Sequence, residues 1–184
     1  MVTKTIKNKA IFLDRDGVII RAPKIKNKPK SIKKINEIKI LYRNQLAIKN
    51  LSKFFKIIVI TNQPDVSRFK IKKSTVNKIN LNLIKKLHID KIYTCFHDNK
   101  DNCDCRKPKI GNILKAKKKY KLNLKKSYFI GDRNSDVEAG KKAGCTNYFI
   151  DRNYDEKKPS KKDCSYTKSL YSASVRILKY EKNK

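Results

Sequence analysis

Two short stretches of the chain carry aspartates at close spacing. DRDG places Asp14 and Asp16 two positions apart. GDRNSD places Asp132 and Asp136 about one helical turn apart. Two carboxylates this close repel each other unless a cation or a proton lies between them, and carboxylate oxygens are ligands that Mg²⁺ prefers. The DRDG spacing therefore predicts a magnesium site.

Other polar groups could act on a phosphate ester together with these aspartates. TNQ begins at Thr61 and supplies a hydroxyl and two amides, while Arg106 and Lys107 supply positive charge. Phosphoryl transfer through an aspartyl phosphate needs a carboxylate nucleophile and a second carboxyl group for proton transfer. It also needs neutral donors, a cation and a metal-binding carboxylate. Taken singly, each motif also occurs in surface turns or helix caps. Their order along the chain favours the catalytic interpretation.

A cluster of softer ligands lies between these motifs. Cys95, His97, Cys103 and Cys105 follow the spacing C-x-H-x5-C-x-C. Three thiolates and an imidazole fit a closed tetrahedral Zn²⁺ site, which has no open position and is therefore structural. Reduced cysteines without metal are one alternative, and a disulfide, which a reducing compartment disfavours, is another. We expect zinc to pin this polar loop and the Arg-Lys pair that follows it.

Short apolar runs alternate with turns and helical patterns along most of the chain. This alternation predicts a three-layer, Rossmann-like α/β fold with a mainly parallel sheet of about five strands. The whole chain, 1–184, is expected to form one domain without a large cap, and the polar segment 21–39 is expected to be a loop. The expected strands are residues 9–14, 56–61, 91–96, 127–132 and 146–151. The expected helices lie near residues 41–51, 76–87, 136–143 and 165–180, with another beginning near Ile110.

Four of the expected strands are followed by the residues that could do chemistry. Asp14 closes the first strand and Thr61 the second. Lys107 follows the third strand, and Asp132 closes the fourth. In an open parallel sheet, ligands collect beyond the carboxyl ends of the strands. We therefore expect these groups to meet at one edge of the sheet.

The composition is strongly basic. The 184 residues have a formal net charge of +32, from 48 Lys and Arg against 16 Asp and Glu. A basic surface is typical of nucleic-acid-binding proteins, but only eight of the basic residues are Arg, which contributes most to recognition of bases and phosphates. A genome rich in A/T codons for Lys, Asn and Ile explains the charge as well. Because no apolar run approaches a membrane span or a signal peptide, we expect a cytoplasmic protein that does not enter membranes.

Taken together, these motifs resemble those of the haloacid dehalogenase superfamily of phosphatases. The matching segments are DRDGV, TNQPDVSR, CFH with CDCRKPK, and GDRNSDVEAGKKAGC, which together span most of residues 9–151. Within the superfamily, the chain is similar to the branch that contains heptose bisphosphate phosphatases and histidinol-phosphate phosphatase domains. The zinc ligand types also occur in this branch.

The resemblance implies a role for each matching residue. Asp14 is the expected nucleophile, and Asp16 the expected general acid and later base. Mg²⁺ is expected between Asp14, the backbone carbonyl of Asp16 and Asp132, with Thr61 and Lys107 on the transferring phosphoryl group. Asp136 has two possible roles. It could support the metal site through a contact with one of the metal ligands, or it could stabilise the N-terminus of a helix. The residues expected to bind substrate are Arg15, Asn62, Arg106 and Arg133.

The segment after DRDGV departs from the family. Ile20 stands where many relatives have Asn, and RAPKIKNKPKS replaces a loop with Gly and Tyr, so sugar contacts of that loop cannot be transferred. The branch implies an enzyme that binds a small phosphorylated sugar and removes the C7 phosphate of D-glycero-D-manno-heptose 1,7-bisphosphate for surface polysaccharide synthesis. We expect it to be a monomer. Histidinol phosphate is the alternative substrate. A nucleic-acid-binding protein or a polynucleotide 3'-phosphatase is the alternative from another class.

Overall fold

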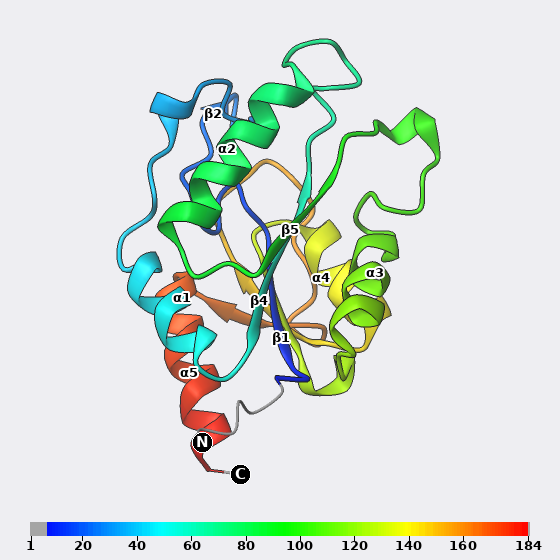
Figure 1. Ribbon diagram of the computed structural model, residues 1–184. Coiled ribbons are helices and arrows are strands. Elements are labelled where there is room, and N and C mark those ends of the chain that lie inside the picture. The colour runs from blue at the N-terminus through cyan, green and yellow to red at the C-terminus, as the bar shows by residue number, and fades with distance from the viewer. Residues whose placement is uncertain (1–6, 184) are drawn as a thin grey trace.

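The computed structural model describes residues 7–183 and contains a six-stranded parallel sheet in the order β5-β4-β1-β6-β7-β8 (Figure 1). The strands are β1 (Ala10–Leu13), β4 (Lys56–Asn62), β5 (Lys91–Cys95), β6 (Tyr128–Gly131), β7 (Thr146–Ile150) and β8 (Ser165–Thr167). The α-helices are α1 (Asn44–Ser52), α2 (Lys73–Lys86), α3 (Gly111–Tyr120), α4 (Asn134–Ala143) and α5 (Leu170–Lys182). Short 3₁₀ helices cover η1 (Ile35–Glu37), η2 (Asn99–Asp101) and η3 (Leu124–Lys126).

Alternate side chains of the central strand enter two separate hydrophobic cores. Ile11 and Leu13 pack with residues of α1, α2 and α5, whereas Ala10 and Phe12 pack with residues of α3 and α4. All four side chains are fully buried, because successive residues of a strand face opposite sides and helices cover both sides of this sheet. The two helical layers are visible on either side of the sheet in Figure 1.

The order of the strands reverses at β1. Leu13 is in register with Val59 of β4 on one side and with Ile130 of β6 on the other. The chain builds β4 and β5 on the first side and then crosses over to build β6, β7 and β8 on the second. Loops at the carboxyl ends of neighbouring strands diverge at such a point and leave a crevice for a ligand. Asp14 after β1 and Asp132 after β6 both lie at this crevice.

The predicted α/β fold and its five strands are confirmed, but the last predicted helix begins later than expected. Ser165–Thr167 form a sixth strand, β8, and the helix that follows, α5, begins at Leu170. Ser169 marks the boundary, since its hydroxyl oxygen accepts a hydrogen bond of 3.1 Å from the backbone N–H of Ser172 and caps the helix. Within residues 7–183, no helix has the length and apolar character needed to cross a membrane.

The polar segment 21–39 is more ordered than the predicted loop. It contains an antiparallel hairpin of β2 (Lys24–Ile25) and β3 (Lys28–Pro29). The two turn residues, Lys26 and Asn27, have φ values of 48° and 54°, the conformation that a two-residue hairpin turn requires.

Candidate active site

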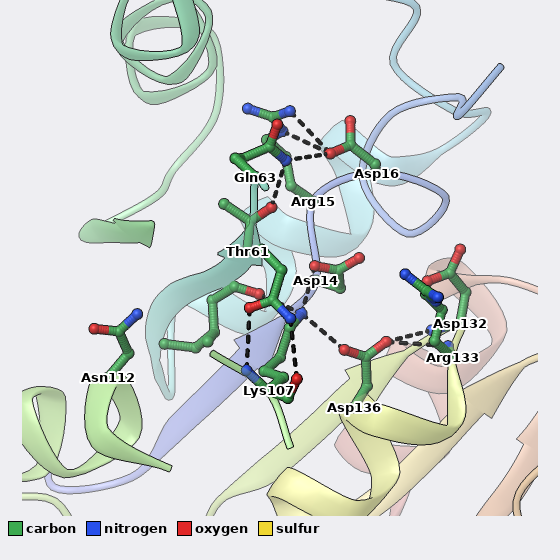
Figure 2. A network of polar contacts seen from close by, with 12 residues as sticks. Asp14, Arg15, Asp16, Thr61, Gln63, Lys107, Asn112, Asp132, Arg133 and Asp136 are labelled. Carbon is green, nitrogen blue, oxygen red and sulfur yellow. Dashed lines mark hydrogen bonds and ion pairs between the residues drawn. The ribbon is translucent and has the colours of Figure 1, made fainter. Parts of the chain in front are cut away.

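Lys107 lies between two carboxylates at the carboxyl edge of the sheet. Its Nζ atom is 2.6 Å from Asp14 Oδ1 and 2.7 Å from Asp136 Oδ1, and it donates to the Ile60 carbonyl oxygen at 2.7 Å (Figure 2). All three charged side chains are buried. Burial alone lowers the pKa of Lys107, but the charges of Asp136 and Asp14 outweigh it and raise the pKa above its ordinary value. Lys107 is therefore a permanent positive charge beside Asp14.

Three carboxylates converge on a space suited to a divalent cation. One oxygen from each of Asp14, Asp132 and Asp136 lies within 4.8 Å of the others. Asp132 Oδ1 is buried and has no hydrogen-bond partner in the described part of the chain, whereas Oδ2 accepts from the Tyr154 hydroxyl at 2.8 Å. A buried carboxylate oxygen without a partner is costly unless a cation or proton meets it. The oxygen donors present here fit Mg²⁺.

The same environment disfavours negative charge on these acids when no metal is bound. Burial, followed by the charges of Asp14 and Asp136, raises the pKa of Asp132 well above its ordinary value. Burial also raises the pKa of Asp14 to about 6, although Lys107 works in the opposite direction. A divalent cation would reverse both effects, because opposite charge favours the ionised form.

Asp136 uses its second oxygen to shape the loop after β6. Oδ2 accepts hydrogen bonds from the backbone N–H groups of Asp132 at 3.1 Å and Arg133 at 3.0 Å. Asp136 also lies in the first turn of α4, where a carboxylate interacts favourably with the helix dipole. Both sequence interpretations of Asp136 therefore fit the structure, since one side chain holds the backbone of Asp132 and stabilises the helix start.

Two glycines allow the loops that carry these carboxylates to come close together. A Cβ atom on Gly17 would lie 1.7 Å from Asp132 Oδ2, and one on Gly131 would lie 2.1 Å from the Cβ of Asp136. Gly17 also has a φ of 86°, a conformation that other residues rarely adopt. A side chain at either glycine would displace a carboxylate of the cluster.

A line of hydrogen bonds orients Asp16. Gln63 Nε2 lies 2.8 Å from Asp16 Oδ2 and 2.9 Å from the hydroxyl of Thr61, and an Arg15 N–H lies 2.8 Å from the same Asp16 oxygen (Figure 2). The other oxygen, Asp16 Oδ1, has no hydrogen-bond partner within residues 7–183. One oxygen of Asp16 is therefore held in place while the other stays available.

A cavity of about 310 Å³ opens in front of Asp14. Its walls come from the loops after β1, β5 and β6, from the end of β4, and from the β2–β3 hairpin with Lys28 and Lys30. The structure thus brings the separate sequence motifs together at one site. The predicted residues that line the cavity are Asp14, Asp16, Thr61, Asn62, Arg106, Lys107 and Arg133.

Some predicted substrate-binding groups already have partners. The Asn62 amide exchanges two hydrogen bonds of 3.1 Å with the backbone of Lys107, which fixes the position of this lysine. Arg133 forms two hydrogen bonds with Glu156, at 2.8 and 2.5 Å. Arg106 donates to a neighbouring amide oxygen at 2.6 Å and forms no ion pair with a carboxylate in the described residues. Substrate binding by these three residues stays a prediction.

Arg15 does not face the cavity. Its side chain is completely buried, and its guanidinium donates to Asp16 and, at 2.9 Å, to Asn80 Oδ1. The prediction that Arg15 binds substrate does not fit this position, because a ligand cannot reach the guanidinium. The Gln63 amide was counted among the polar groups of TNQ but given no separate role, and Tyr154 was left out of the predicted site. Tyr154 lies 22 residues after Asp132 and carries no local signal.

The four predicted zinc ligands come together at the end of β5. Cys95 Sγ lies 3.7 Å from both His97 Nδ1 and Cys103 Sγ, and Cys105 Sγ lies 3.3 Å from His97 Nδ1 and 3.5 Å from Cys103 Sγ. Tetrahedral zinc with bonds of about 2.0–2.3 Å requires ligand atoms roughly 3.5–3.8 Å apart. Because all five cysteines are free thiols, the cluster is spaced for a metal rather than closed by a disulfide.

Comparisons with known proteins agree with this geometry. A family model described as polynucleotide kinase 3 phosphatase matches residues 9–181. The chain belongs to this family of haloacid dehalogenase-type phosphatases. It is 40% identical over 140 residues to the D-glycero-alpha-D-manno-heptose-1,7-bisphosphate 7-phosphatase of Campylobacter jejuni, with 73% of this chain and 77% of that protein covered. It is 37% identical over 150 residues to a D-glycero-beta-D-manno-heptose-1,7-bisphosphate 7-phosphatase of Helicobacter pylori, with coverage of 78% and 83%.

Two further matches concern a longer relative and a solved structure. The chain is 33% identical over 138 residues to the histidine biosynthesis bifunctional protein HisB of Blochmanniella floridana, but covers only 38% of that longer protein. A crystal structure of D,D-heptose 1.7-bisphosphate phosphatase from B. bronchiseptica, complexed with magnesium and phosphate, matches with a TM-score of 0.79 over 94% of this chain and 99% of that chain. At 24% identity, this last likeness concerns the fold. The predicted superfamily is confirmed.

Proposed function

We propose that this phosphatase is a magnesium-dependent phosphomonoester hydrolase that works through a phosphorylated Asp14. The position of Asp14 carries the proposal. It follows the central strand, lies 2.6 Å from Lys107 and lines the cavity. One of its oxygens is also within 4.8 Å of carboxylate oxygens of Asp132 and Asp136.

The residues fit a reaction in two halves. An oxygen of Asp14 attacks phosphorus, the bond from phosphorus to the ester oxygen breaks, and Asp16 gives that oxygen a proton. Lys107 and the Thr61 hydroxyl offset the charge on the phosphoryl oxygens. A water molecule then attacks the phosphorus of the aspartyl phosphate and gives its proton to Asp16. Inorganic phosphate leaves, and Asp14 is again a carboxylate.

Magnesium would be held by Asp14, the backbone carbonyl of Asp16 and Asp132. When bound, it supplies positive charge beside the phosphoryl oxygens and reduces their repulsion of the attacking carboxylate. The unpartnered Asp132 Oδ1 supports this assignment.

The arrangement around Asp16 supports its role in proton transfer. Gln63 and Arg15 hold Oδ2, so that rotation of the carboxylate is restricted. The buried Oδ1 has no partner in the described chain and can exchange a proton with the leaving oxygen and later with water. Arg15 thus belongs to catalysis as a positioning residue.

The best substrate is a D-glycero-D-manno-heptose 1,7-bisphosphate, the compound named in the relatives of Campylobacter jejuni and Helicobacter pylori. The chemistry of the cavity agrees with two phosphates. Lys107 lies at the nucleophile, while Lys28 and Lys30 line the wall and form no ion pair within residues 7–183. These two free cations fit a second phosphate better than the uncharged end of a monophosphate.

A polynucleotide 3'-phosphatase is the second candidate, favoured by the description of the matching family model and by the net charge of +32. Salt separates the two functions. Binding of an oligonucleotide weakens steeply as ionic strength rises, because counterions are released from many phosphates. Turnover of a small ester involves few phosphates and should change much less.

Phosphate release tests the proposal with three substrates: heptose 1,7-bisphosphate, histidinol phosphate and a 3'-phosphorylated oligonucleotide. We expect the highest kcat/KM with the heptose, dependence on Mg²⁺, and no turnover by Asp14→Asn. Preference for the oligonucleotide would reject the proposed substrate and keep the mechanism. Full activity of Asp14→Asn would reject the mechanism itself.

Zinc in the cysteine and histidine cluster completes the proposal. It would hold the segment from Cys95 to Cys105 and, through it, Arg106 and Lys107 at the cavity. Burial opposes a negative charge on Cys103, but hydrogen bonds, among them those of the Cys105 and Arg106 backbone, outweigh it and lower the pKa to about 7. Burial raises the pKa of Cys95 and Cys105 instead, so bound zinc would have to favour the thiolate forms of these two ligands.

A further inference from the structure

Tyr154 contacts the proposed magnesium ligand Asp132 from outside the catalytic cavity. Its hydroxyl donates to Asp132 Oδ2 at 2.8 Å, and the residue is buried. Tyr154 does not line the cavity of 310 Å³ but a separate hollow of about 520 Å³, together with Gly17, Lys24 and Arg152. A substrate beside Asp14 therefore does not touch the phenol, and any effect of Tyr154 on the reaction must pass through Asp132.

The loop that carries Tyr154 is fixed at several points. Arg152 Nε donates to the Gly17 carbonyl oxygen at 2.8 Å, which ties the loop to the turn after β1. The β2–β3 hairpin holds it from the other end, since the N–H of Asp155 donates to the carbonyl oxygen of Asn27 at 3.1 Å. Lys24 Nζ lies 5.3 Å from the centroid of the Tyr154 ring. The phenol is thus held against Asp132 by two neighbouring segments.

The hydrogen bond distinguishes the two oxygens of Asp132. Oδ2 is occupied by the phenol, whereas Oδ1 is buried without a partner within residues 7–183. The phenol hydroxyl has one proton to donate, and Asp132 Oδ2 accepts it. One fixed donor on one oxygen sets the rotation of the carboxylate and leaves the other oxygen for a cation.

Gly17 makes this contact possible. A Cβ atom at this position would lie 1.7 Å from Asp132 Oδ2 and 2.7 Å from the Tyr154 hydroxyl oxygen. The turn of the DRDG motif therefore leaves the space in which the phenol and the carboxylate meet.

We propose that Tyr154 is a positioning residue that presents Asp132 Oδ1 to the metal as a single-oxygen ligand. The inference rests on the proposed magnesium site. Without the phenol, Asp132 can rotate and its second oxygen loses its partner. Loss of a hydrogen bond behind a metal ligand typically lowers metal affinity about ten- to a hundredfold.

Direct metal binding to the full chain tests the proposal. Tyr154→Phe removes the hydroxyl and keeps the ring. Tyr166→Phe is the matched control, because its hydroxyl also makes a 2.8 Å hydrogen bond, to the Pro159 carbonyl oxygen, and does not contact the carboxylate cluster. Mn²⁺ binding is followed by electron paramagnetic resonance and Mg²⁺ binding by calorimetry, with thermal unfolding of both variants as the check on folding.

We expect the Kd for Mn²⁺ to rise about tenfold or more in Tyr154→Phe and to stay within about twofold in Tyr166→Phe. In the phosphate-release assay, the KM for Mg²⁺ should rise by the same factor, and excess Mg²⁺ should restore kcat. Unchanged Mn²⁺ affinity in Tyr154→Phe, or equal weakening in both variants, would overturn the role of Tyr154. Wild-type protein that binds neither ion would overturn the metal site and this inference together. Wild-type protein that binds Mn²⁺ but hydrolyses no phosphate ester would reject the proposed function alone, and the Kd comparison would still decide the role of Tyr154.

Discussion

Asp14 lies in surroundings that act on its charge in opposite directions. Burial disfavours the carboxylate and Lys107 favours it, and the balance raises the pKa of Asp14 to about 6. Without metal, the ionised residue is a buried charge near Asp132 and Asp136. The site that suits a cation is therefore a source of instability when the cation is absent.

Replacing Asp14 with Asn should stabilise the metal-free protein at pH 8. Since the pKa is about 6 in the folded chain and 3.8 when unperturbed, the folded state binds more protons between these values, and stability falls as pH rises through them. An Asn side chain does not titrate and so does not lose stability in this way. The free energy of unfolding of Asp14→Asn should therefore exceed that of the wild type by about 1–3 kcal/mol at pH 8, and should equal it below about pH 4. Urea unfolding without added Mg²⁺ measures this. A variant no more stable than wild type at pH 8 would contradict the expectation.

The direction of a side chain decided which site residues could be predicted. Asp14 and Asp16 were predicted correctly to reach the cavity, because they follow a buried strand at the carboxyl edge. Arg15 between them is buried and donates to Asp16 and Asn80, so the substrate-binding role that the resemblance implied does not fit its position. Tyr154 reaches Asp132 only through the path of the loop after β7, which no local pattern encodes.

Two segments outside the main sheet carry residues of the site, the loop after β5 and the β2–β3 hairpin. The polar loop after β5 contains η2, which begins with a capping box of Asp98 and Asp101. Arg68 adds two hydrogen bonds of 2.6 Å to Asp98 and lowers the pKa of that carboxyl group. These contacts are exposed, and exposed ion pairs contribute little, so we expect metal binding by the cysteine cluster to provide most of the order.

Cys103→Ser should remove zinc and loosen the loop that carries Lys107. Wild-type protein should contain about one zinc per chain, and the variant almost none, because a closed site needs all four ligands. Hydrogen exchange in residues 95–109 should rise, and phosphatase activity should fall with it. Cys164→Ala, which removes a buried thiol outside the cluster, is the control and should keep zinc. A zinc-free variant with unchanged exchange and activity would show that the metal has no structural role.

The β2–β3 hairpin should select substrates with a second phosphate. Lys28 and Lys30 line the cavity, whereas Lys26 and Lys33 do not. Changing the first pair to Met should lower the ratio of kcat/KM for heptose 1,7-bisphosphate over heptose 7-phosphate about tenfold, as expected for two exposed charge contacts. The second pair, changed to Met, alters net charge equally and should keep the ratio. The same ratio in both double variants would rule out this role of the hairpin.

The sequence patterns were too weak to predict two of the secondary-structure elements, the β2–β3 hairpin and β8. The five long apolar runs were predicted correctly, because buried parallel strands need continuous apolar residues. Ser165–Thr167 is too short and polar for such a signal, and its strand form depends on pairing with β7. The hairpin turn at Lys26 and Asn27 lacks the glycine that usually marks one, so the segment resembled a plain loop.

The whole molecule combines a common parallel-sheet architecture with an unusually basic surface. The fold follows from alternating apolar patterns, which the charge of +32 leaves intact because the described lysines other than Lys107 are exposed or half-buried. The sheet places the carboxyl ends of β1, β4 and β6 side by side, and this arrangement brings Asp14, Thr61 and Asp132 to one site. Net charge alone could not identify the substrate, since it acts over the whole surface and the cavity selects by a few groups.

Trapping the phosphorylated enzyme tests the nucleophile most directly. Wild-type protein is mixed with heptose 1,7-bisphosphate and Mg²⁺, quenched in acid within milliseconds and reduced with borohydride, which converts an aspartyl phosphate to homoserine. Peptide mass spectrometry should find homoserine at position 14, and at no position in Asp14→Asn. Phosphate release by the wild type with Asp14 unmodified, or with homoserine at another aspartate, would contradict the assignment of Asp14 as the residue that accepts the phosphoryl group.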